Sequence, residues 1–384
     1  MNNKAVPPEN YQNKKVILII FGTRPEIIKL FILYKLLKES EEFYPVFVNT
    51  MQQSMSSEIL EDLNITVDIE CSEIQNRSAD LNQFISHIML DFNEKFNVKH
   101  CIIPSNEIAG VIVQGDTASA YSGAIWSFMN KIPVFHVEAG LRTFDHENPF
   151  PEEFFRESIA RTSSINFCPT HISYDNLVRE GINARKNYIV GNTINDAMIE
   201  LLKMEKIVEP RLDNFILSTL HRRENWNHVP DYARILQNVL KEQIVDESIL
   251  HLIHPNPIVK NSFLKIFEKS FPEKLIVRNP VHDYFKMLGF VKNSHTILTD
   301  SGGLQEESLF FNIPCGIMRK VTERPEVLSR NAKLLPFKRM QVKEFLVEAK
   351  EYRQSKINEG YDYTYGRGNS SNQIYDVMKR FYKF

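Results

Sequence analysis

VILIIFGTRPEIIK, residues 16–29, is the stretch that decides the fold. Residues 16–20 are a continuous apolar run, which is the composition of a strand that is buried on both faces. The run stops at Gly22, and a helix is expected from about Pro25, with proline at a first-turn position and apolar residues at helical spacing. A buried strand that passes directly into an amphipathic helix predicts a parallel α/β fold.

The same alternation of buried strand and helix continues along the chain. In the first half, further strands are expected at 45–49, 111–113, 134–137 and 188–190. A second series is expected at 215–219, 250–253, 275–277, 296–298 and 316–318. Parallel strands joined by helices require right-handed crossovers. Two series of about five strands therefore predict two doubly wound domains rather than one large sheet.

The break between the domains is expected near a predicted helix, 196–208, which ends in Glu-Pro at 209–210. The predicted bounds are an N-terminal Rossmann-like domain at 1–195, a C-terminal one at 196–370, and a last amphipathic helix at 371–384 that packs back on the first domain. Doubly wound sheets bind ligands beyond the carboxyl ends of their strands. With two such domains, the expected site is the cleft between them.

Composition excludes several classes of function. The 384 residues include 46 Lys and Arg against 48 Asp and Glu, a formal charge of −2, which argues against non-specific nucleic-acid binding. Four cysteines lie far apart without a CxxC pair, so neither a disulfide scaffold nor a zinc site is expected. Residues 1–15 lack the apolar core of a secretory signal, and no apolar run approaches the roughly 20 residues of a membrane span. We expect a cytoplasmic protein with no membrane or nucleic-acid partner.

Three carboxylates follow predicted strands of the first domain or the loops beyond them. Asp116 lies in QGDT, Glu138 in HVEAGLRT and Glu152 in PFPEE. They are expected on the same side of one sheet, where mutual repulsion raises at least one pKa and provides an acid or base near neutral pH. The alternative interpretation is that Asp116 caps a helix and that Glu152 is a solvated loop residue.

Cations stand at two predicted strand ends. Arg24 and Lys29 lie at the start of a helix, where positive charge opposes the helix dipole unless an anion answers it. His221, followed by Arg222, closes the first strand of the second domain and suits a diphosphate. The alternative for the first pair is simple solvation. Arg319, which follows the last strand, could hold a ribose or phosphate.

Two glycines mark a second junction of strand and helix. Gly302 and Gly303 follow Asp300-Ser301, where backbone N–H groups at a helix start can approach a phosphate. The alternative is an N-cap with turn glycines. His251 and His254 have the spacing of a metal-ligand pair, but on a strand they would point to opposite faces, so both are interpreted as structural and no metal is expected.

Nine motifs together resemble the non-hydrolysing UDP-N-acetylglucosamine 2-epimerase family. They are GTRPEIIK (22–29), QGDT (114–117), HVEAGLRT (136–143), PFPEE (149–153), GNTINDA (191–197), HRREN (221–225), HPNP (254–257), DSGGLQEE (300–307) and TERPE (322–326). The resemblance implies the GT-B type of α/β fold, in which two Rossmann-like domains face a central cleft. It also implies a homodimer that needs neither a metal nor a cofactor.

The resemblance implies reversible epimerisation at carbon 2 of UDP-GlcNAc, which yields UDP-ManNAc for surface polysaccharide. UDP would be eliminated and added back through a 2-acetamidoglucal intermediate. Asp116, Glu138 and Glu152 match the family's catalytic carboxylates, and we expect the first and third to transfer protons while Glu138 stabilises charge. His221 matches its essential histidine. The residues expected to bind substrate are Arg24, Lys29, Arg142, Arg222, Asn256, Ser301, Gly302, Gly303, Glu307 and Arg319.

The chain departs from the family pattern in two places. It has Thr-Met-Gln-Gln at 50–53 where the family usually reads TGQH, near the site of an activating second UDP-GlcNAc in bacterial members. It has Phe154-Phe155 where an asparagine usually precedes the arginine, a change that could suit a modified sugar. The alternatives are a hydrolysing epimerase that releases ManNAc and UDP, an epimerase of a UDP-diacetamido sugar, a GT-B glycosyltransferase, and an inactive UDP-sugar-binding regulator.

Overall fold

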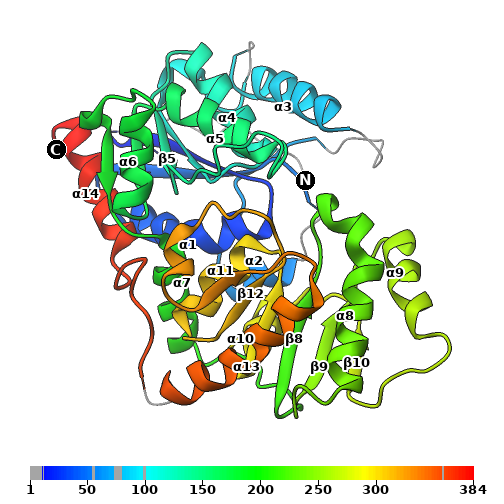
Figure 1. Cartoon of the computed structure of the whole chain (residues 1–384). Helices are drawn as coiled ribbons and strands as arrows, with labels where there is room; N and C mark the ends of the chain where they lie inside the picture. Colours follow the sequence, from blue (N-terminus) through cyan, green and yellow to red (C-terminus); the bar gives the residue numbers. More distant parts are fainter. Residues whose placement is uncertain (1–10, 12, 54–56, 73–79, 98–100, 357–358) are drawn as a thin grey trace. The chain divides into compact units, whose positions relative to one another are not determined.

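The computed structural model describes residues 11, 13–53, 57–72, 80–97, 101–356 and 359–384 (Figure 1). Segment 1–10, part of the stretch interpreted as carrying no secretory signal, lies outside them. The chain forms two compact units. Unit 1 comprises Met1–Ile199 and Tyr365–Phe384, and unit 2 comprises Glu200–Thr364.

Unit 1 is built on a seven-stranded sheet in the order β3-β2-β1-β4-β5-β6-β7, in which every pair of neighbours is parallel. The strands are β1 (Lys15–Phe21), β2 (Phe43–Asn49), β3 (Ile69–Glu70), β4 (Ile108–Gln114), β5 (Val134–Val137), β6 (Ile165–Cys168) and β7 (Asn187–Ile189). The helices are α1 (Arg24–Glu39), α2 (Ser57–Asp62), α3 (Leu81–Phe96), α4 (Ala118–Met129), α5 (Glu152–Thr162), α6 (His171–Arg179), α7 (Thr193–Lys203) and α14 (Ser370–Tyr382), with short 3₁₀ turns at Ser105–Glu107 and Ala184–Lys186.

The two faces of β1 explain why this strand is wholly apolar. Leu18 and Ile20 belong to a core cluster that also holds Trp126 of α4 and Phe92 of α3. Alternate residues point to the other face, where Phe21 stacks on Phe47 with ring centroids 4.1 Å apart. A strand covered on both sides by helices must be apolar throughout, as the sequence indicates.

Unit 2 contains a six-stranded parallel sheet in the order β10-β9-β8-β11-β12-β13. The strands are β8 (Phe215–Thr219), β9 (Ser248–Leu252), β10 (Leu275–Arg278), β11 (Thr296–Thr299), β12 (Cys315–Ile317) and β13 (Ala332–Leu334). The helices are α8 (Val229–Lys241), α9 (Pro257–Leu264), α10 (Tyr284–Asn293), α11 (Gly302–Phe310), α12 (Pro325–Leu328) and α13 (Arg339–Lys356), with 3₁₀ turns at Arg223–His228 (η4) and Lys265–Phe267.

The prediction of two doubly wound parallel sheets is confirmed, with corrections in detail. Strands β3, β6 and β13 were not expected. The helix predicted at 196–208 is wrong at both ends, because α7 runs from Thr193 to Lys203 and the chain leaves it through Glu205, whose φ is 53°. Within the described ranges, no helix is long and apolar enough to cross a membrane.

Candidate functional site

Unit 1 reverses its strand order between β1 and β4. Successive connections run outward from β1 to β2 and β3, and from β4 to β5, β6 and β7. Doubly wound sheets bind ligands at such a switch point, where the two flanking loops diverge. The GTRPE motif follows β1 and the QGDT motif follows β4. The two motifs therefore occupy the place where this topology puts a ligand.

Glu26 links these two motifs. Its Oε2 accepts hydrogen bonds from the backbone N–H groups of Gly22 (3.0 Å) and Thr23 (2.8 Å) and from the Thr23 hydroxyl (2.7 Å). Its Oε1 accepts one from the Thr117 hydroxyl at 2.7 Å. The side chain is fully buried, and this burial raises its pKa to about 7, against the lowering effect of those hydrogen bonds.

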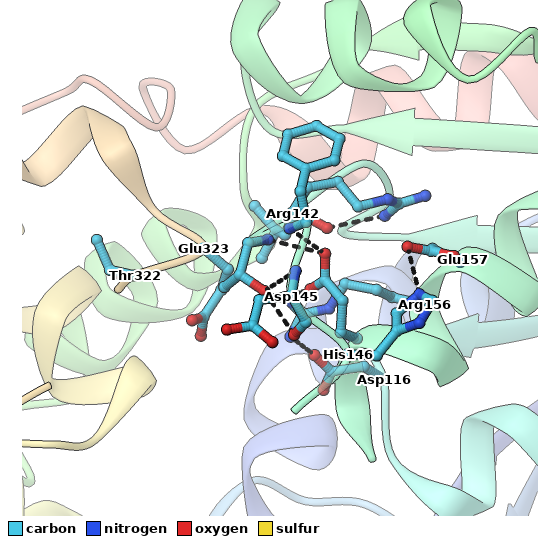
Figure 2. A network of polar contacts seen from close by, with 12 residues as sticks. Asp116, Arg142, Asp145, His146, Arg156, Glu157, Thr322 and Glu323 are labelled. Atoms are coloured by element: carbon cyan, nitrogen blue, oxygen red, sulfur yellow. Dashed lines mark hydrogen bonds and ion pairs between the residues drawn. The ribbon is translucent and has the colours of Figure 1, made fainter. Parts of the chain in front are cut away.

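Asp116 is oriented by an arginine (Figure 2). Arg156 of α5 contacts the Asp116 carboxylate and donates from its Nη1 to Glu153 Oε2 at 3.0 Å. Glu153 in turn accepts the backbone N–H groups of Thr143 and Phe144, both at 2.8 Å. Arg156 is 3% exposed, whereas the Asp116 side chain is 27% exposed, so a buried guanidinium orients a carboxylate that is still accessible to solvent.

Glu138 directly follows β5, the neighbour of β4. Lys29 of α1 forms an ion pair with its Oε2, which also accepts from Gln114 Nε2 at 3.1 Å and Asn192 Nδ2 at 3.3 Å. Its φ of 66° lies in the left-handed region, which is uncommon for a residue with a side chain. Strained backbone of this kind clusters at functional sites, because the surrounding structure must fix it.

The register places these carboxylates at one edge of the sheet. Gln114 of β4 pairs with Val137 of β5, so Asp116 and Glu138 lie one or two residues beyond adjacent strand ends. Glu152 is the first residue of α5, next to the Glu153 that Arg156 binds. The structure thus places Asp116 and Glu138 in loops after adjacent strands and Glu152 at the start of α5, all within unit 1.

His136 supports the turn that carries Asp116. Its Nε2 lies 2.8 Å from the carbonyl oxygen of Gly115, a residue with φ of 67°. The ring is fully buried, and burial lowers its pKa to about 4, so the imidazole is neutral at pH 7. A neutral ring whose Nε2–H donates to this carbonyl holds the glycine turn in place.

Arg142 is already engaged inside unit 1. Its Nε and Nη2 donate to the two carboxylate oxygens of Glu180 at 2.6 and 2.9 Å, and its Nη1 donates to the carbonyl of Leu141 at 2.8 Å. This bidentate pair is buried on the arginine side. The predicted substrate role of Arg142 stays a prediction. Arg24, the other arginine predicted to bind substrate in this unit, is the first residue of α1.

Unit 2 reverses its strand order between β8 and β11. At this switch point, buried Asp300 accepts the backbone N–H groups of His221 and Arg222 and the side-chain amide of Asn225, all at 2.9 Å. It therefore fixes the HRREN loop. Burial lowers the pKa of His221, and the nearby Asp300 carboxylate opposes this effect.

The histidines of the β9 segment have different places. His251 is buried in the core of unit 2, stacked on Phe263 with centroids 4.1 Å apart. His254 lies beyond the strand, because β9 ends at Leu252, and its ring centroid is 6.0 Å from that of His221. The strand-face argument for His254 was therefore wrong, because this residue follows the strand and its ring lies near that of His221.

The start of α11 combines one packed glycine with one open glycine. A Cβ added at Gly302 would lie 2.7 Å from Nη1 of Arg324, whereas one at Gly303 would meet only Ser301 Oγ, at 4.0 Å. Ser301 is the N-cap. The backbone at Gly303 is thus accessible to a ligand, as a phosphate contact requires.

The remaining predicted residues of unit 2 have partners within it. Glu307 accepts the hydroxyl of Tyr284 at 2.7 Å, and Arg319 pairs with Glu323 at 2.9 Å. Asn256 caps α9, accepting the N–H of Ile258 at 2.9 Å. Their predicted roles in binding stay predictions. Across the described parts of the chain, no cluster of His, Cys, Asp and Glu has the arrangement of a metal site.

Local sequence patterns did not identify five residues near these sites: Glu26, Glu153, Arg156, Asn192 and His254. Glu26, Glu153 and Arg156 lie within or beside recognised motifs, so position in a motif was the available signal. Asn192 also lies in a motif, GNTINDA, but its contact with Glu138 spans 54 residues of sequence. No local spacing predicts a contact of that range.

Comparison with known proteins connects this geometry to a family. A family model described as UDP-N-acetylglucosamine 2-epimerase matches residues 35–379. The UDP-N-acetylglucosamine 2-epimerase of Methanocaldococcus jannaschii is 34% identical over 378 residues, covering 94% of this chain and 98% of the relative.

Solved structures are similar along almost the whole chain. UDP-GlcNAc 2-epimerase from Neisseria meningitidis, bound to UDP-GlcNAc, is 28% identical with a TM-score of 0.82, covering 95% of this chain and 100% of that one. S. aureus MnaA, solved with UDP, is 30% identical with a TM-score of 0.83, covering 96% and 97%. This likeness confirms the predicted GT-B type of fold.

Proposed function

The chain belongs to the UDP-N-acetylglucosamine 2-epimerase family, and from this premise we propose that it interconverts UDP-GlcNAc and UDP-ManNAc without releasing free sugar. The observation that carries the proposal is the pair of carboxylates at adjacent strand ends of unit 1. Asp116 is held by Arg156, and Glu138 is held by Lys29. Each carboxylate is therefore oriented by a cation of its own unit before substrate binds, which is the preorganisation that charge stabilisation requires.

The chemistry at carbon 2 explains why carboxylates are needed. The carbon 2 proton is not adjacent to a carbonyl, so its removal must be coupled to loss of the leaving group. A base takes this proton, the bond between the anomeric carbon and the UDP oxygen breaks, and UDP leaves with the electron pair. The double bond between carbons 1 and 2 gives the 2-acetamidoglucal. Return of a proton to the opposite face of carbon 2, with re-addition of UDP, gives the epimer.

We assign the roles according to position. Asp116 and Glu152 transfer the protons at carbon 2, and Glu138 stabilises positive charge at the anomeric carbon as UDP departs. In unit 2, His221 and the open backbone at Gly303 contact the UDP moiety, and cationic side chains stabilise the leaving diphosphate. The support for this division is the placement of both groups at switch points.

The first experiment is proton NMR of the full chain with UDP-GlcNAc in D₂O. Formation of UDP-ManNAc, with deuterium entering carbon 2 of both epimers, is the expected result. Free ManNAc with UDP would instead indicate the hydrolysing reaction and contradict the proposal. UDP binding without turnover of UDP-GlcNAc would also contradict the proposal, and a UDP-diacetamido sugar is then the next compound to test.

Two substitutions separate an enzyme from a UDP-sugar-binding protein. Asp116→Asn and Glu138→Gln keep the size of each side chain and remove its charge. Each is expected to lower kcat at least 100-fold while the Kd for UDP, measured by calorimetry, changes less than about threefold. Equal losses of turnover and UDP affinity would contradict these roles.

We further propose, from family membership, a homodimer whose product feeds surface polysaccharide synthesis. Light scattering during size-exclusion chromatography measures the mass directly against the 44.8 kDa of one chain. A mass near twice that value is expected. A single-chain mass at micromolar concentration would contradict the dimer.

A further inference from the structure

The switch point of unit 1 contains a buried acid whose contacts exceed what its own helix requires. A glutamate three residues after an N-cap usually accepts the N-cap backbone N–H, and Glu26 does this with Thr23. Its second oxygen is not needed for that task. It reaches instead to Thr117, 91 residues away in the sequence and directly after Asp116.

The direction of that second contact is fixed. Thr117 is the N-cap of α4, and its hydroxyl oxygen accepts the N–H of Ala120 at 3.0 Å. The hydroxyl proton is therefore available to Glu26, whose Oε1 can only accept while the carboxylate is charged. The contact orients Thr117 and ties the turn after β4 to the loop after β1.

We propose that Glu26 is a positioning residue that fixes the turn carrying Asp116, acting through the Thr117 hydroxyl. The inference rests on the proposed function, in which Asp116 transfers a proton at carbon 2 of the sugar. Asp116 is then constrained twice: Arg156 binds its carboxylate, and the contact between Glu26 and Thr117 holds its backbone.

The burial of Glu26 supports a role beyond capping. The side chain has 0% exposure, and within the described part of the chain all its polar contacts are hydrogen bonds from backbone N–H and hydroxyl groups. A buried carboxylate without a cation is unfavourable unless hydrogen bonds compensate it. A displacement of about 1 Å at a reacting group can reduce a rate about 100-fold, so a rigid turn has a large effect on turnover.

The test compares three variants of the full chain. Glu26→Gln replaces one acceptor oxygen with an N–H₂ group, and Thr117→Val removes the hydroxyl at nearly constant shape. Each is expected to lower kcat for UDP-GlcNAc epimerisation 10- to 100-fold with KM changed less than about threefold. Thr117→Ser restores the hydroxyl and is expected to recover most of the rate lost in Thr117→Val.

A double variant and a capping control complete the design. Glu26→Gln with Thr117→Val is expected to be no slower than Thr117→Val alone, because that single variant already lacks both the contact with Glu26 and the cap to Ala120. Asp80→Ala removes the N-cap of α3, where Asp80 accepts the N–H of Gln83 at 2.9 Å, and is expected to lower the melting temperature without changing kcat. Wild-type kcat in both Glu26→Gln and Thr117→Val, or additive losses in the double variant, would overturn the proposal.

Failure of the proposed function would be recognised separately. In that case the wild-type chain itself forms no UDP-ManNAc from UDP-GlcNAc. Crystal structures of Thr117→Val and Thr117→Ser then decide the positioning role: a displaced Asp116 carboxylate in the first variant alone supports it, and an unmoved carboxylate in both refutes it. If Glu26→Gln does not fold, these Thr117 variants carry the same test.

Discussion

At the scale of single residues, the site of unit 1 consists of charges held in place before any ligand arrives. Lys29 was expected to bind substrate and Arg156 was given no role, yet each binds a carboxylate of the same unit. Removing one member of such a buried pair leaves the other charge without compensation, which is more costly than losing a surface pair. The side chains of this site therefore contribute to stability as well as to chemistry.

The raised pKa of Glu26 predicts a pH-dependent stability. Its folded pKa of about 7 exceeds the ordinary value of 4.5. Between these two values the folded state therefore retains a proton that the unfolded state has lost. The contribution of this group to the stability of the fold is complete below pH 4.5 and is lost as pH rises through 7. The full effect is on the order of 3 kcal/mol. Glu26→Gln should lack this dependence. Between pH 5 and 8 the urea midpoint of the wild type should therefore fall relative to that of the variant. A constant difference would contradict it.

Met51 shows how a departure from the family motif is accommodated. It has φ of 60° at the place where the family usually carries glycine, and its N–H donates to Asn49 Oδ1 at 2.9 Å. Phe155, at the other departure, lies in the core and stacks on Tyr121 with centroids 4.6 Å apart. Phe155 is therefore a packing residue of α5, and we base no sugar specificity on it.

At the scale of elements, the first turn of α11 allows a direct test of phosphate approach. Gly303→Ala adds a methyl group to open space, so the fold should be unaffected or stabilised by up to about 1 kcal/mol. If a phosphate contacts this backbone, the Kd for UDP should rise at least tenfold by calorimetry. Gly360→Ala is the control, since a Cβ there meets no atom within 4 Å. Unchanged affinity in Gly303→Ala would exclude close approach.

One carboxylate of α7 holds the first two residues of helix α14. Asp196 of α7 accepts the N–H groups of Ser370 (3.1 Å) and Ser371 (2.6 Å), and it is 4% exposed. Asp196→Ala leaves two buried donors unsatisfied, so we expect a loss of about 2–4 kcal/mol. Thermal unfolding and hydrogen exchange in α14 measure it, with exposed Asp175→Ala as control. Equal stability of the two variants would be inconsistent with this anchor.

Most elements were predictable because their signal is local. Strands 134–137 and 215–219 coincide with β5 and β8, since continuous apolar runs identify buried parallel strands. Strand β6 was missed because Asn166 interrupts the pattern. This side chain is buried and donates to Asn187 Oδ1 at 3.1 Å, a partner that only the fold supplies. The site divides in the same way: motifs located Asp116, while its pairing with Arg156 arises from tertiary structure.

At the scale of the whole molecule, each unit holds one of the two tryptophans, and among the described residues each has one buried neutral histidine. Burial lowers the pKa of His136 in unit 1 to about 4 and that of His251 in unit 2 to about 3. Their stabilisation is present above pH 6.5 and is lost as pH falls through these depressed values. Both units should therefore lose stability in acid.

The two tryptophans allow the units to be followed separately. Trp126 lies in α4 and Trp226 in η4. In a Trp126→Phe background, the fluorescence of Trp226 reports the unfolding of unit 2. There His251→Phe should reduce the loss of stability between pH 6.5 and 4, and the new ring can still stack on Phe263. The matched Trp226→Phe chain reports unit 1 and should respond to His136→Phe instead. A response of both reporters to either substitution would show that the units unfold as one.

The discontinuity of unit 1 has a consequence for biosynthesis. Unit 2 is continuous in sequence, whereas unit 1 needs α14, which the ribosome makes after unit 2. Aromatic residues of α14 and the segment after it cover Phe43 and Phe135, two fully buried side chains of unit 1. During translation the second unit can therefore finish folding before the first, and a nascent chain that stalls before α14 would present these rings to chaperones.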